Sequence, residues 1–498
     1  MKRKTVLDLF RKGEFFNFYY SHVVSSLTNS SKEVSLNSIF FAIKGSSADG
    51  HHFIEDAVRK GAKTVVLQDK MWAEFLRKRY PQINVVLAEN TRKMLAEISR
   101  IYFDYPDRKL KVIGITGTNG KTTVSHLTAQ YLQMLGIKTG IIGTTGYKVE
   151  EKILSEGRTT PDPIQWYKTL FQMKQMGAEF VVAEVSSHAL DQYRVYGTRF
   201  KGVVFTNLSP EHLDYHRDME NYFEAKRRLF SWNRQSPSAV NADDIYGKRL
   251  LQEFESSSGY GFSDGAHFRI SDVDLSHNGT VFTIFYRGKK YPVRTKLIGK
   301  FNVYNTAAAF SHESVRSGFK PEDLSELSWR LTPVRGRIEI LEGEGFRVII
   351  DYAHTPDALK NVLETLNSLK NGRIITVFGA GGDRDRSKRP VMGEIASKYS
   401  GVIIITSDNP RSENPMEIIQ DIKRGTNKNS DVYIIPDREE AIKEAVYMAG
   451  RDDTVLIAGK GHEIYQEIKG VKVPFDDRSV AEKYIKKRQQ KLPRQEKR

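Results

Sequence analysis

Short apolar runs alternate with helix-like segments along most of this chain. In the first hundred residues, runs at 38–43 and 64–67 flank the start of a helix at 54–60. Two further series repeat this order. Their strands are predicted at 139–142, 180–185 and 202–206, and then at 347–352, 373–378, 402–406, 432–435 and 454–458, with helices at 415–423 and 439–448. Strands that alternate with helices predict an α/β fold with mainly parallel sheets.

The stretch 268–297 has a different pattern. Its apolar and polar positions alternate around Asn278-Gly279, and Asn-Gly is the strongest short signal for a β-hairpin. An antiparallel ribbon is therefore predicted within the otherwise parallel arrangement. No period of about 20 to 50 residues repeats, which excludes a solenoid.

The length of 498 residues exceeds one ordinary hydrophobic core, so several domains are expected. A polar segment at 102–111 contains Pro106 and predicts a linker. We accordingly divide the chain into domains at 1–108, 109–336 and 337–485. The tail 486–498 has seven basic residues against one acid, and this composition predicts a disordered, solvated segment.

The formal net charge of +16 admits two kinds of anionic partner. Nucleic acid is one, although no RNA- or DNA-binding motif is present; a phosphate-bearing small substrate explains the charge equally well. The lack of cysteine excludes disulfides and thiolate sites. No segment approaches about 18 consecutive apolar residues and no signal peptide is visible. We therefore expect a soluble cytoplasmic protein without a membrane span.

A glycine-rich loop follows the apolar run at 112–116 and ends in Lys-Thr-Thr before a helical segment at 124–135. This strand–loop–helix order is typical of a phosphate-binding loop, in which backbone N–H groups and the helix N-terminus surround an anion. Lys121 would reach the β- and γ-phosphates, and the Thr122 hydroxyl would hold Mg²⁺. The strict pattern G-x-x-x-x-G-K-[ST] fails by one position, because residue 115 is Ile. A glycine-rich turn without a nucleotide is the alternative.

Acidic and histidine side chains follow two of the predicted strands. Glu184 lies at the end of the run 180–185, and the loop 207–216 contains two histidines and two acids. A carboxylate opposite the phosphate loop is well placed to hold Mg²⁺, although Glu184 could instead cap the next element. Three charged loops, from 351 onward, at 379–389 and at 407–413, follow strands of the last series, where open α/β sheets bind ligands.

Six motifs in this order resemble those of the Mur ligases. They are TGTNGKTT at 116–123, EVSSH at 184–188, NL with HLDYH within 207–216, NVYNTAA at 302–308, DYAHTPDAL at 351–359 and GKGHE at 459–463. The resemblance covers nearly the whole chain except the tail. It implies a small α/β uridine-nucleotide domain, a central P-loop ATPase domain with a mainly parallel sheet and a C-terminal Rossmann-like domain.

The resemblance also implies a reaction, which is ATP-dependent amide ligation through an acyl phosphate. The expected substrates are ATP, UDP-N-acetylmuramoyl-L-alanyl-D-glutamate and the third residue of the peptidoglycan peptide. The expected cofactor is Mg²⁺. Nucleic acid is not expected as a partner, and a monomer is expected.

By the same resemblance, the catalytic residues are Lys121, Lys226, His212 and Glu184, and the metal ligands are Thr122, Glu184, His212 and Lys226 as a carbamate. The ATP contacts are Gly117, Thr118, Asn119, Gly120, Lys121, Thr122, Thr123, Asn302, Arg337 and Asp351. The UDP-substrate contacts are Ser30, Ser46, Ser47, Ala48, Thr159, Thr160, Ser186, Gln192 and Arg194. A surface lysine within the basic run 226–228 is the alternative for Lys226. The chain departs from relatives at Asn29-Ser30-Ser31, where they read Asp-Ser-Arg, and at Arg158, where they often carry Asn.

The tetrapeptide Asp408-Asn409-Pro410-Arg411 resembles the family's signature for meso-diaminopimelate. A planar guanidinium suits bidentate capture of a carboxylate. The implied amino-acid contacts are Arg389, Asp408, Asn409, Pro410, Arg411, Gly459 and Glu463. Alternatives are ligation of L-lysine or ornithine, a folate polyglutamate synthetase-like ligase, and a nucleic-acid-dependent P-loop ATPase.

Overall fold

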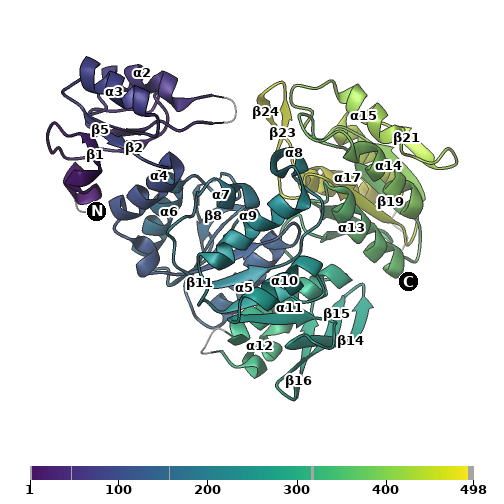
Figure 1. The fold of residues 1–498 in the computed structure, drawn as a ribbon. Coiled ribbons are helices and arrows are strands. Elements are labelled where there is room, and N and C mark those ends of the chain that lie inside the picture. Colours follow the sequence, from purple (N-terminus) through teal and green to yellow (C-terminus); the bar gives the residue numbers. More distant parts are fainter. Residues whose placement is uncertain (1–2, 46–47, 156, 316–318, 492–498) are drawn as a thin grey trace.

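The computed structural model describes residues 3–45, 48–155, 157–315 and 319–491. Three α/β parts follow one another along the chain (Figure 1). The first, in purple, and the last, in green and yellow, lie on either side of the upper part of the central one. No helix in the described ranges is both long enough and apolar enough to cross a membrane.

The first part is a five-stranded sheet covered by helices. Its strand order is β1-β5-β4-β3-β2, parallel except for β1 against β5. The strands are β1 (Phe15–Asn17), β2 (Leu27–Thr28), β3 (Ile39–Phe41), β4 (Thr64–Leu67) and β5 (Asn84–Leu87). The helices are α1 (Val6–Leu9), α2 (Ile54–Arg59), α3 (Lys70–Arg79) and α4 (Thr91–Tyr102). β3 and β4 are wholly buried, as their uninterrupted apolar runs predict for strands covered on both faces.

The central sheet has eleven strands in the order β16-β15-β14-β13-β12-β11-β6-β10-β7-β8-β9. The pairs from β14 to β7 are parallel and those at both ends are antiparallel. The core strands are β6 (Lys111–Thr116), β7 (Thr139–Gly143), β10 (Phe180–Glu184), β11 (Phe200–Phe205), β12 (Ser238–Asn241) and β13 (Ser257–Gly261). This bears out the expected mainly parallel sheet.

Successive residues of β6 supply two different cores. Val112 packs in one apolar cluster with Trp166 and Leu229, whereas Ile113 packs in another with Leu127. The helices around this sheet are α5 (Lys121–Met134), α6 (Pro163–Gln175), α7 (Ser187–Asp191), α8 (Leu213–His216), α9 (Met219–Ser231), α10 (Ile245–Glu253), α11 (Lys300–Val315) and α12 (Pro321–Leu327). Burial on both faces holds the carboxyl edge of the sheet in place.

The ribbon at one end of this sheet confirms the Asn278-Gly279 hairpin. Its strands are β14 (Phe268–Ser276), β15 (Gly279–Tyr286) and β16 (Lys289–Thr295), and Ser276 pairs with Gly279 across the turn. At the other end, β8 (Gly146–Val149) and β9 (Lys152–Ser155) form antiparallel strands that the hydrophobic pattern did not predict.

The last part is a six-stranded sheet in the order β17-β18-β22-β19-β20-β21, parallel except for β17. The strands are β17 (Glu339–Glu342), β18 (Arg347–Asp351), β19 (Ile374–Phe378), β20 (Val402–Ile405), β21 (Asp431–Ile434) and β22 (Thr454–Ala458), with a separate hairpin of β23 (Tyr465–Ile468) and β24 (Val471–Pro474). The helices are α13 (Pro356–Leu369), α14 (Lys388–Tyr399), α15 (Pro415–Lys423), α16 (Arg438–Met448) and α17 (Asp477–Lys491).

The expectation that the whole tail 486–498 is disordered was wrong for its first residues. α17 continues to Lys491, so residues 486–491, which were expected to be disordered, are helical. The helix is anchored by apolar contacts of Tyr484 and Ile485 with the third sheet's core. Residues 492–498 lie outside the described residues.

Candidate active site

The phosphate loop lies between β6 and α5, as predicted, and the helix begins at Lys121. Gly120 has a φ of +85°, and a Cβ there would collide with the side-chain oxygen Oδ1 of Asn305. Gly117 has a φ of +148°, and a Cβ there would collide with the Thr206 hydroxyl. Both positions therefore require glycine, which allows the loop to pack closely against its neighbours.

Lys121 is folded over this loop. Its Nζ donates to the backbone oxygens of Gly117, at 3.0 Å, and Thr118, at 2.7 Å. Burial lowers the pKa of Lys121, and the charges of Glu211 and Glu184 oppose that shift. Two hydrogen bonds thus hold the Lys121 side chain at the loop, and the charges of Glu211 and Glu184, from two other segments, favour its cationic form.

Thr122 and Glu184, two of the expected metal ligands, are in contact. β10 is parallel to β6, which brings its final residue, Glu184, beside Ile115 at the carboxyl edge. The Thr122 hydroxyl donates to Glu184 Oε2 at 2.9 Å. Thr144, which follows the neighbouring strand β7, donates to Glu184 through its backbone N–H at 2.9 Å and through its hydroxyl at 3.0 Å. The buried carboxylate is therefore held in one orientation.

Lys226 is not a surface residue. Only 1% of it is exposed, and α9 directs its Nζ to the Gly117 carbonyl oxygen at 2.7 Å and over the Tyr222 ring. Burial holds the pKa of Lys226 well below its usual range, and Lys121 adds to that shift. This environment favours the neutral amine and excludes the alternative of a solvated surface lysine.

His212 lies in a cluster with a second acid that sequence reasoning left without a role. Glu211 Oε2 is 3.8 Å from His212 Nε2, and Glu211 Oε1 is 3.9 Å from His354 Nε2. Burial opposes ionisation of Glu211, but His212, His354, Lys121 and Lys226 together hold its pKa below the usual value. Within the described residues, no three His, Asp or Glu side chains are arranged to hold a metal by themselves. The expected ligand set includes only two residues of these types, Glu184 and His212.

The residues expected to contact the muramoyl-dipeptide gather beside Glu184. Thr160 donates to the Glu184 carbonyl at 2.8 Å and accepts from the Ser186 N–H at 3.0 Å. Arg194 donates to the Thr160 carbonyl at 2.9 Å and to the Gln192 side chain at 2.9 Å. Thr159 joins them through a 3.1 Å hydroxyl contact with Thr144. The structure therefore brings all five of these predicted residues to one edge.

The predicted uridine contacts lie in the first part of the chain. Ser30 and Ala48 follow β2 and β3, two adjacent parallel strands, so they share the carboxyl edge of that sheet. The Ser30 N–H donates to Thr28 Oγ1 at 3.0 Å, and the Ala48 carbonyl accepts from Gly45 at 2.8 Å. Ser46 and Ser47 lie outside the described residues.

The three predicted nucleotide contacts from later in the chain occupy different positions. Arg337 Nη2 donates to the Thr122 hydroxyl at 3.2 Å. Asn302 accepts a 3.0 Å hydrogen bond from Asn305, the residue packed on Gly120. The Asp351 carboxylate accepts the backbone N–H groups of Ile338 and Ala353, both at 2.8 Å, and burial raises its pKa. Arg337 and Asn302 therefore adjoin the phosphate loop, whereas Asp351 organises the junction near residue 338.

Most of the predicted amino-acid contacts form one cluster at the carboxyl edge of the third sheet. Asn409 donates to Glu463 at 2.8 Å and accepts from Lys460 at 3.0 Å. Gly459 has a φ of +116°, and a Cβ there would collide with the Asp408 carboxylate. Pro410 is buried beside them.

Arg411 spans from this cluster to the neighbouring loop. Its Nη1 donates to the Gly382 carbonyl at 2.6 Å, and its Nε lies 3.4 Å from Glu467. The side chain is 23% exposed. Arg411 is therefore partly paired and still accessible to an anionic group.

Arg389, one of the expected amino-acid contacts, is already paired within the chain. Its side chain is fully buried and pairs with Glu413 and Asp421, both at 2.9 Å. A third contact runs to the Gly381 carbonyl. Because its terminal nitrogens are paired with two carboxylates, Arg389 stabilises the 381–413 region.

Side chains from the third part reach the phosphate loop and were not predicted to do so. Asp357 accepts from the Asn119 side chain at 2.9 Å and from Ser209 at 3.2 Å. His462 Nε2 lies 3.2 Å from the Thr144 carbonyl. Asp357, His354 and His462 all lie within motifs that carried the resemblance, but only the tertiary structure reveals their contacts.

Family models match all three parts of the chain. They are described as "Mur ligase family, catalytic domain" at residues 23–103, "Mur ligase middle domain" at 115–312 and "Mur ligase, glutamate ligase domain" at 336–461.

Similar proteins extend over nearly the full length. The chain is 48% identical to a UDP-N-acetylmuramoyl-L-alanyl-D-glutamate–2,6-diaminopimelate ligase from Aquifex aeolicus over 93% of this chain and 94% of that protein. It is 40% identical to a ligase of the same name from Clostridium acetobutylicum, over 93% of this chain and 95% of that one. A solved structure of a ligase with this name superimposes with a TM-score of 0.67 at 32% identity, covering 94% and 96% of the two chains. This chain belongs to the Mur ligase family.

Proposed function

We propose that this chain is an ATP-dependent ligase that adds meso-diaminopimelate to the D-glutamate of UDP-N-acetylmuramoyl-L-alanyl-D-glutamate. The observation that carries the proposal is the meeting of Thr122, Glu184, Lys121 and Lys226 around one glycine loop. Relatives of the same length that bear this activity in their names support it. The part at 1–108 would hold the uridine nucleotide, that at 109–336 ATP, and that at 337–485 the amino acid.

The reaction requires an activated carboxylate. An oxygen of the D-glutamate side chain attacks the γ-phosphorus of ATP, forms an acyl phosphate and releases ADP. The neutral amine of diaminopimelate then attacks the acyl carbon, inorganic phosphate leaves, and the nitrogen loses a proton. Lys121 and the loop N–H groups offset phosphate charge during transfer, as is general for phosphoryl transfer.

The residues present suit Mg²⁺. Thr122 and Glu184 supply a hydroxyl and a carboxylate already in contact, and oxygen donors are what this ion prefers. Burial lowers the pKa of His212, so its imidazole is neutral and free to coordinate at neutral pH. When bound, Mg²⁺ would reduce the charge repulsion between the phosphates and the attacking carboxylate.

A carbamate on Lys226 is the finer part of the proposal. Its formation requires a neutral amine and CO₂, and burial favours that form of Lys226. Addition of CO₂ with loss of a proton converts the side chain into an anion. Lys121, whose cation disfavours a neighbouring ammonium, would attract that anion.

We assign recognition of diaminopimelate to the carboxyl edge of the third sheet. We assign its distal carboxylate to Arg411, its distal ammonium to Glu463, and hydrogen bonds to Asn409 and the Gly459 backbone. Glu467 already pairs with Arg411. When the substrate has no distal carboxylate, the free-energy cost at Arg411 is therefore smaller than the cost of a buried cation that has no partner at all. We expect selectivity over L-lysine of about 1–3 kcal/mol from this contact.

An ATP-hydrolysis assay separates this function from its alternatives. Stimulation by UDP-N-acetylmuramoyl-L-alanyl-D-glutamate with diaminopimelate, and not by folate or RNA, is expected. Lys121→Ala should abolish the stimulated turnover, whereas Lys138→Ala, which changes an exposed lysine, should not. Stimulation by folate alone would favour a folate polyglutamate ligase, and salt-sensitive stimulation by RNA would favour a nucleic-acid-dependent ATPase.

A further inference from the structure

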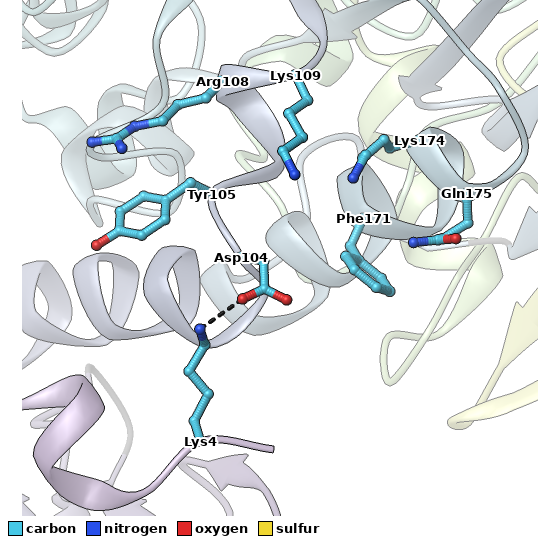
Figure 2. A pocket seen from close by; sticks show the side chains of 8 residues that line it. All are labelled: Lys4, Asp104, Tyr105, Arg108, Lys109, Phe171, Lys174 and Gln175. Carbon is cyan, nitrogen blue, oxygen red and sulfur yellow. Dashed lines mark ion pairs between the residues drawn. The ribbon is translucent and has the colours of Figure 1, made fainter. Parts of the chain in front are cut away.

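A cavity of about 600 Å³ lies where the start of the chain, the linker after α4 and the end of α6 meet. Figure 2 shows its lining side chains. They are Lys4, Asp104, Tyr105, Arg108, Lys109, Phe171, Lys174 and Gln175. None of them is among the residues assigned above to ATP, the UDP-substrate or the amino acid. Its volume is within the range of small-molecule sites.

The lining is strongly basic. Four of its side chains are cationic and one is acidic, and that acid, Asp104, is already paired with Lys4 at 2.6 Å. In the part of the chain that the structure describes, no ion pair within 4.0 Å joins Arg108, Lys109 or Lys174 to a carboxylate. None of these three cations is therefore neutralised by a direct ion pair among the described residues.

Two of these cations face one another. Figure 2 shows the ends of Lys109 and Lys174 directed toward each other above Asp104. Partial burial and the closeness of Lys109 lower the pKa of Lys174. Convergence of like charges is unfavourable without a ligand, and an anion between them would relieve it.

The backbone holds the cations in place. Asp104 and Tyr105 adopt φ values of +60° and +50°, so the linker turns sharply before η3 (Pro106–Arg108). Asp107 is buried, pairs with Arg100 at 2.8 Å and accepts the Arg199 N–H at 3.1 Å. The Arg108 guanidinium stacks on Tyr105 at 4.3 Å. These contacts fix the linker backbone from which Arg108 and Lys109 project, which reduces the ordering cost of binding.

We propose that this cavity is a second anion site, distinct from the phosphate loop, which binds a small polyanion with a diphosphate group. Two opposed ammonium groups suit a ligand with several charged oxygens better than a single carboxylate. Phe171 and Tyr105 supply apolar surface for the remainder of such a ligand.

Calorimetric titration with inorganic pyrophosphate tests this site. It is done in the full-length Lys121→Ala chain, so that the phosphate loop contributes little. We expect saturable binding of one pyrophosphate per chain, weakened at least tenfold by adding Lys109→Gln and Lys174→Gln. The matched control is Lys168→Gln, which removes an exposed charge from the same helix outside the cavity; it should bind as its parent does.

The fold is checked by thermal unfolding without ligand. The Lys109→Gln/Lys174→Gln chain should be at least as stable as its parent, because a like-charge contact is removed. Equal pyrophosphate affinity in that variant and its parent, or titration without saturation, would overturn the proposal. So would binding of an RNA oligonucleotide through these lysines without any binding of pyrophosphate.

Discussion

The side-chain amide of Asn119 donates a hydrogen bond to the Asp357 carboxylate over 2.9 Å. Asn119 belongs to the phosphate loop and Asp357 to the first turn of α13, so this contact links the central and last parts of the chain directly. Ser209 donates to the same carboxylate oxygen. Ligation needs substrates held by different parts of the chain to meet, and Asp357 is well placed to stabilise the arrangement in which they do.

Loss of the Asp357 carboxylate should loosen this contact. We expect Asp357→Ala to lose about 0.5–1.5 kcal/mol of interaction between the two parts, as for ordinary hydrogen bonds. Small-angle scattering should show a larger radius of gyration, and kcat/KM should fall several-fold. Asn367→Ala, at an exposed position of the same helix, is the control. Identical scattering profiles for Asp357→Ala and the parent would contradict a linking role.

Ligase activity should require the carbamate on Lys226. We expect Lys226→Ala to lose ligase activity, with no recovery on adding bicarbonate and partial recovery with short carboxylic acids that replace the missing oxygens. Lys248→Ala, on the exposed face of α10, should retain activity. Full activity of Lys226→Ala without added acid would show that no carbamate is required.

Burial of Lys226 should also be visible in the pH dependence of stability. Its folded-state pKa lies well below 10.5, its value in an open chain. Between those two pKa values the unfolded state binds more protons, so stability rises with pH, by at most about 1.4 kcal/mol per unit. Urea unfolding in bicarbonate-free buffer from about pH 7 to about pH 9 should show the parent gaining stability relative to Lys226→Met. A constant difference between the two proteins over this interval would contradict the assigned environment.

Arg389 should stabilise the folded chain. Removing it leaves Glu413 and Asp421 without their shared buried cation. We expect Arg389→Met to lose about 3–5 kcal/mol of unfolding free energy, and Arg451→Met, at an exposed position, to change it by less than about 0.5 kcal/mol. If Arg389→Met kept its stability but lost selectivity for the amino acid, Arg389 would act by direct contact with the substrate and not through stability.

The hydrophobic pattern predicted those strands and helices whose own residues are apolar enough to indicate that they are buried. β22 and α15 have the predicted bounds, and the Asn278-Gly279 turn lies where the alternation placed it. β12 was missed because Ser238–Asn241 is polar at both ends, and its burial comes from β11 and β13 on either side. β8 and β9 were missed for a similar reason, since β9 is largely exposed and is a strand only by pairing with β8.

Site residues could be predicted from the sequence where neighbouring parallel strands bring them to the same edge of a sheet. Glu184 and Thr122 meet because Glu184 ends β10 and Thr122 follows β6, the neighbouring parallel strand. Arg389 shows the limit, because its partners Glu413 and Asp421 come from segments that approach only in the folded chain. Glu211 shows another limit. Its acid was visible in the loop 207–216, but three of the four basic side chains that act on it, Lys121, Lys226 and His354, come from other segments of the chain.

The most direct test offers candidate amino acids one at a time to the purified chain. ATP, Mg²⁺ and UDP-N-acetylmuramoyl-L-alanyl-D-glutamate are supplied, and the UDP-linked product is identified by mass spectrometry. The proposed function predicts product with meso-diaminopimelate, about 5- to 150-fold lower kcat/KM with L-lysine, and loss of that preference in Arg411→Ala but not in Arg451→Ala. Equal efficiency with both amino acids, or no ligated product with any of them, would contradict it.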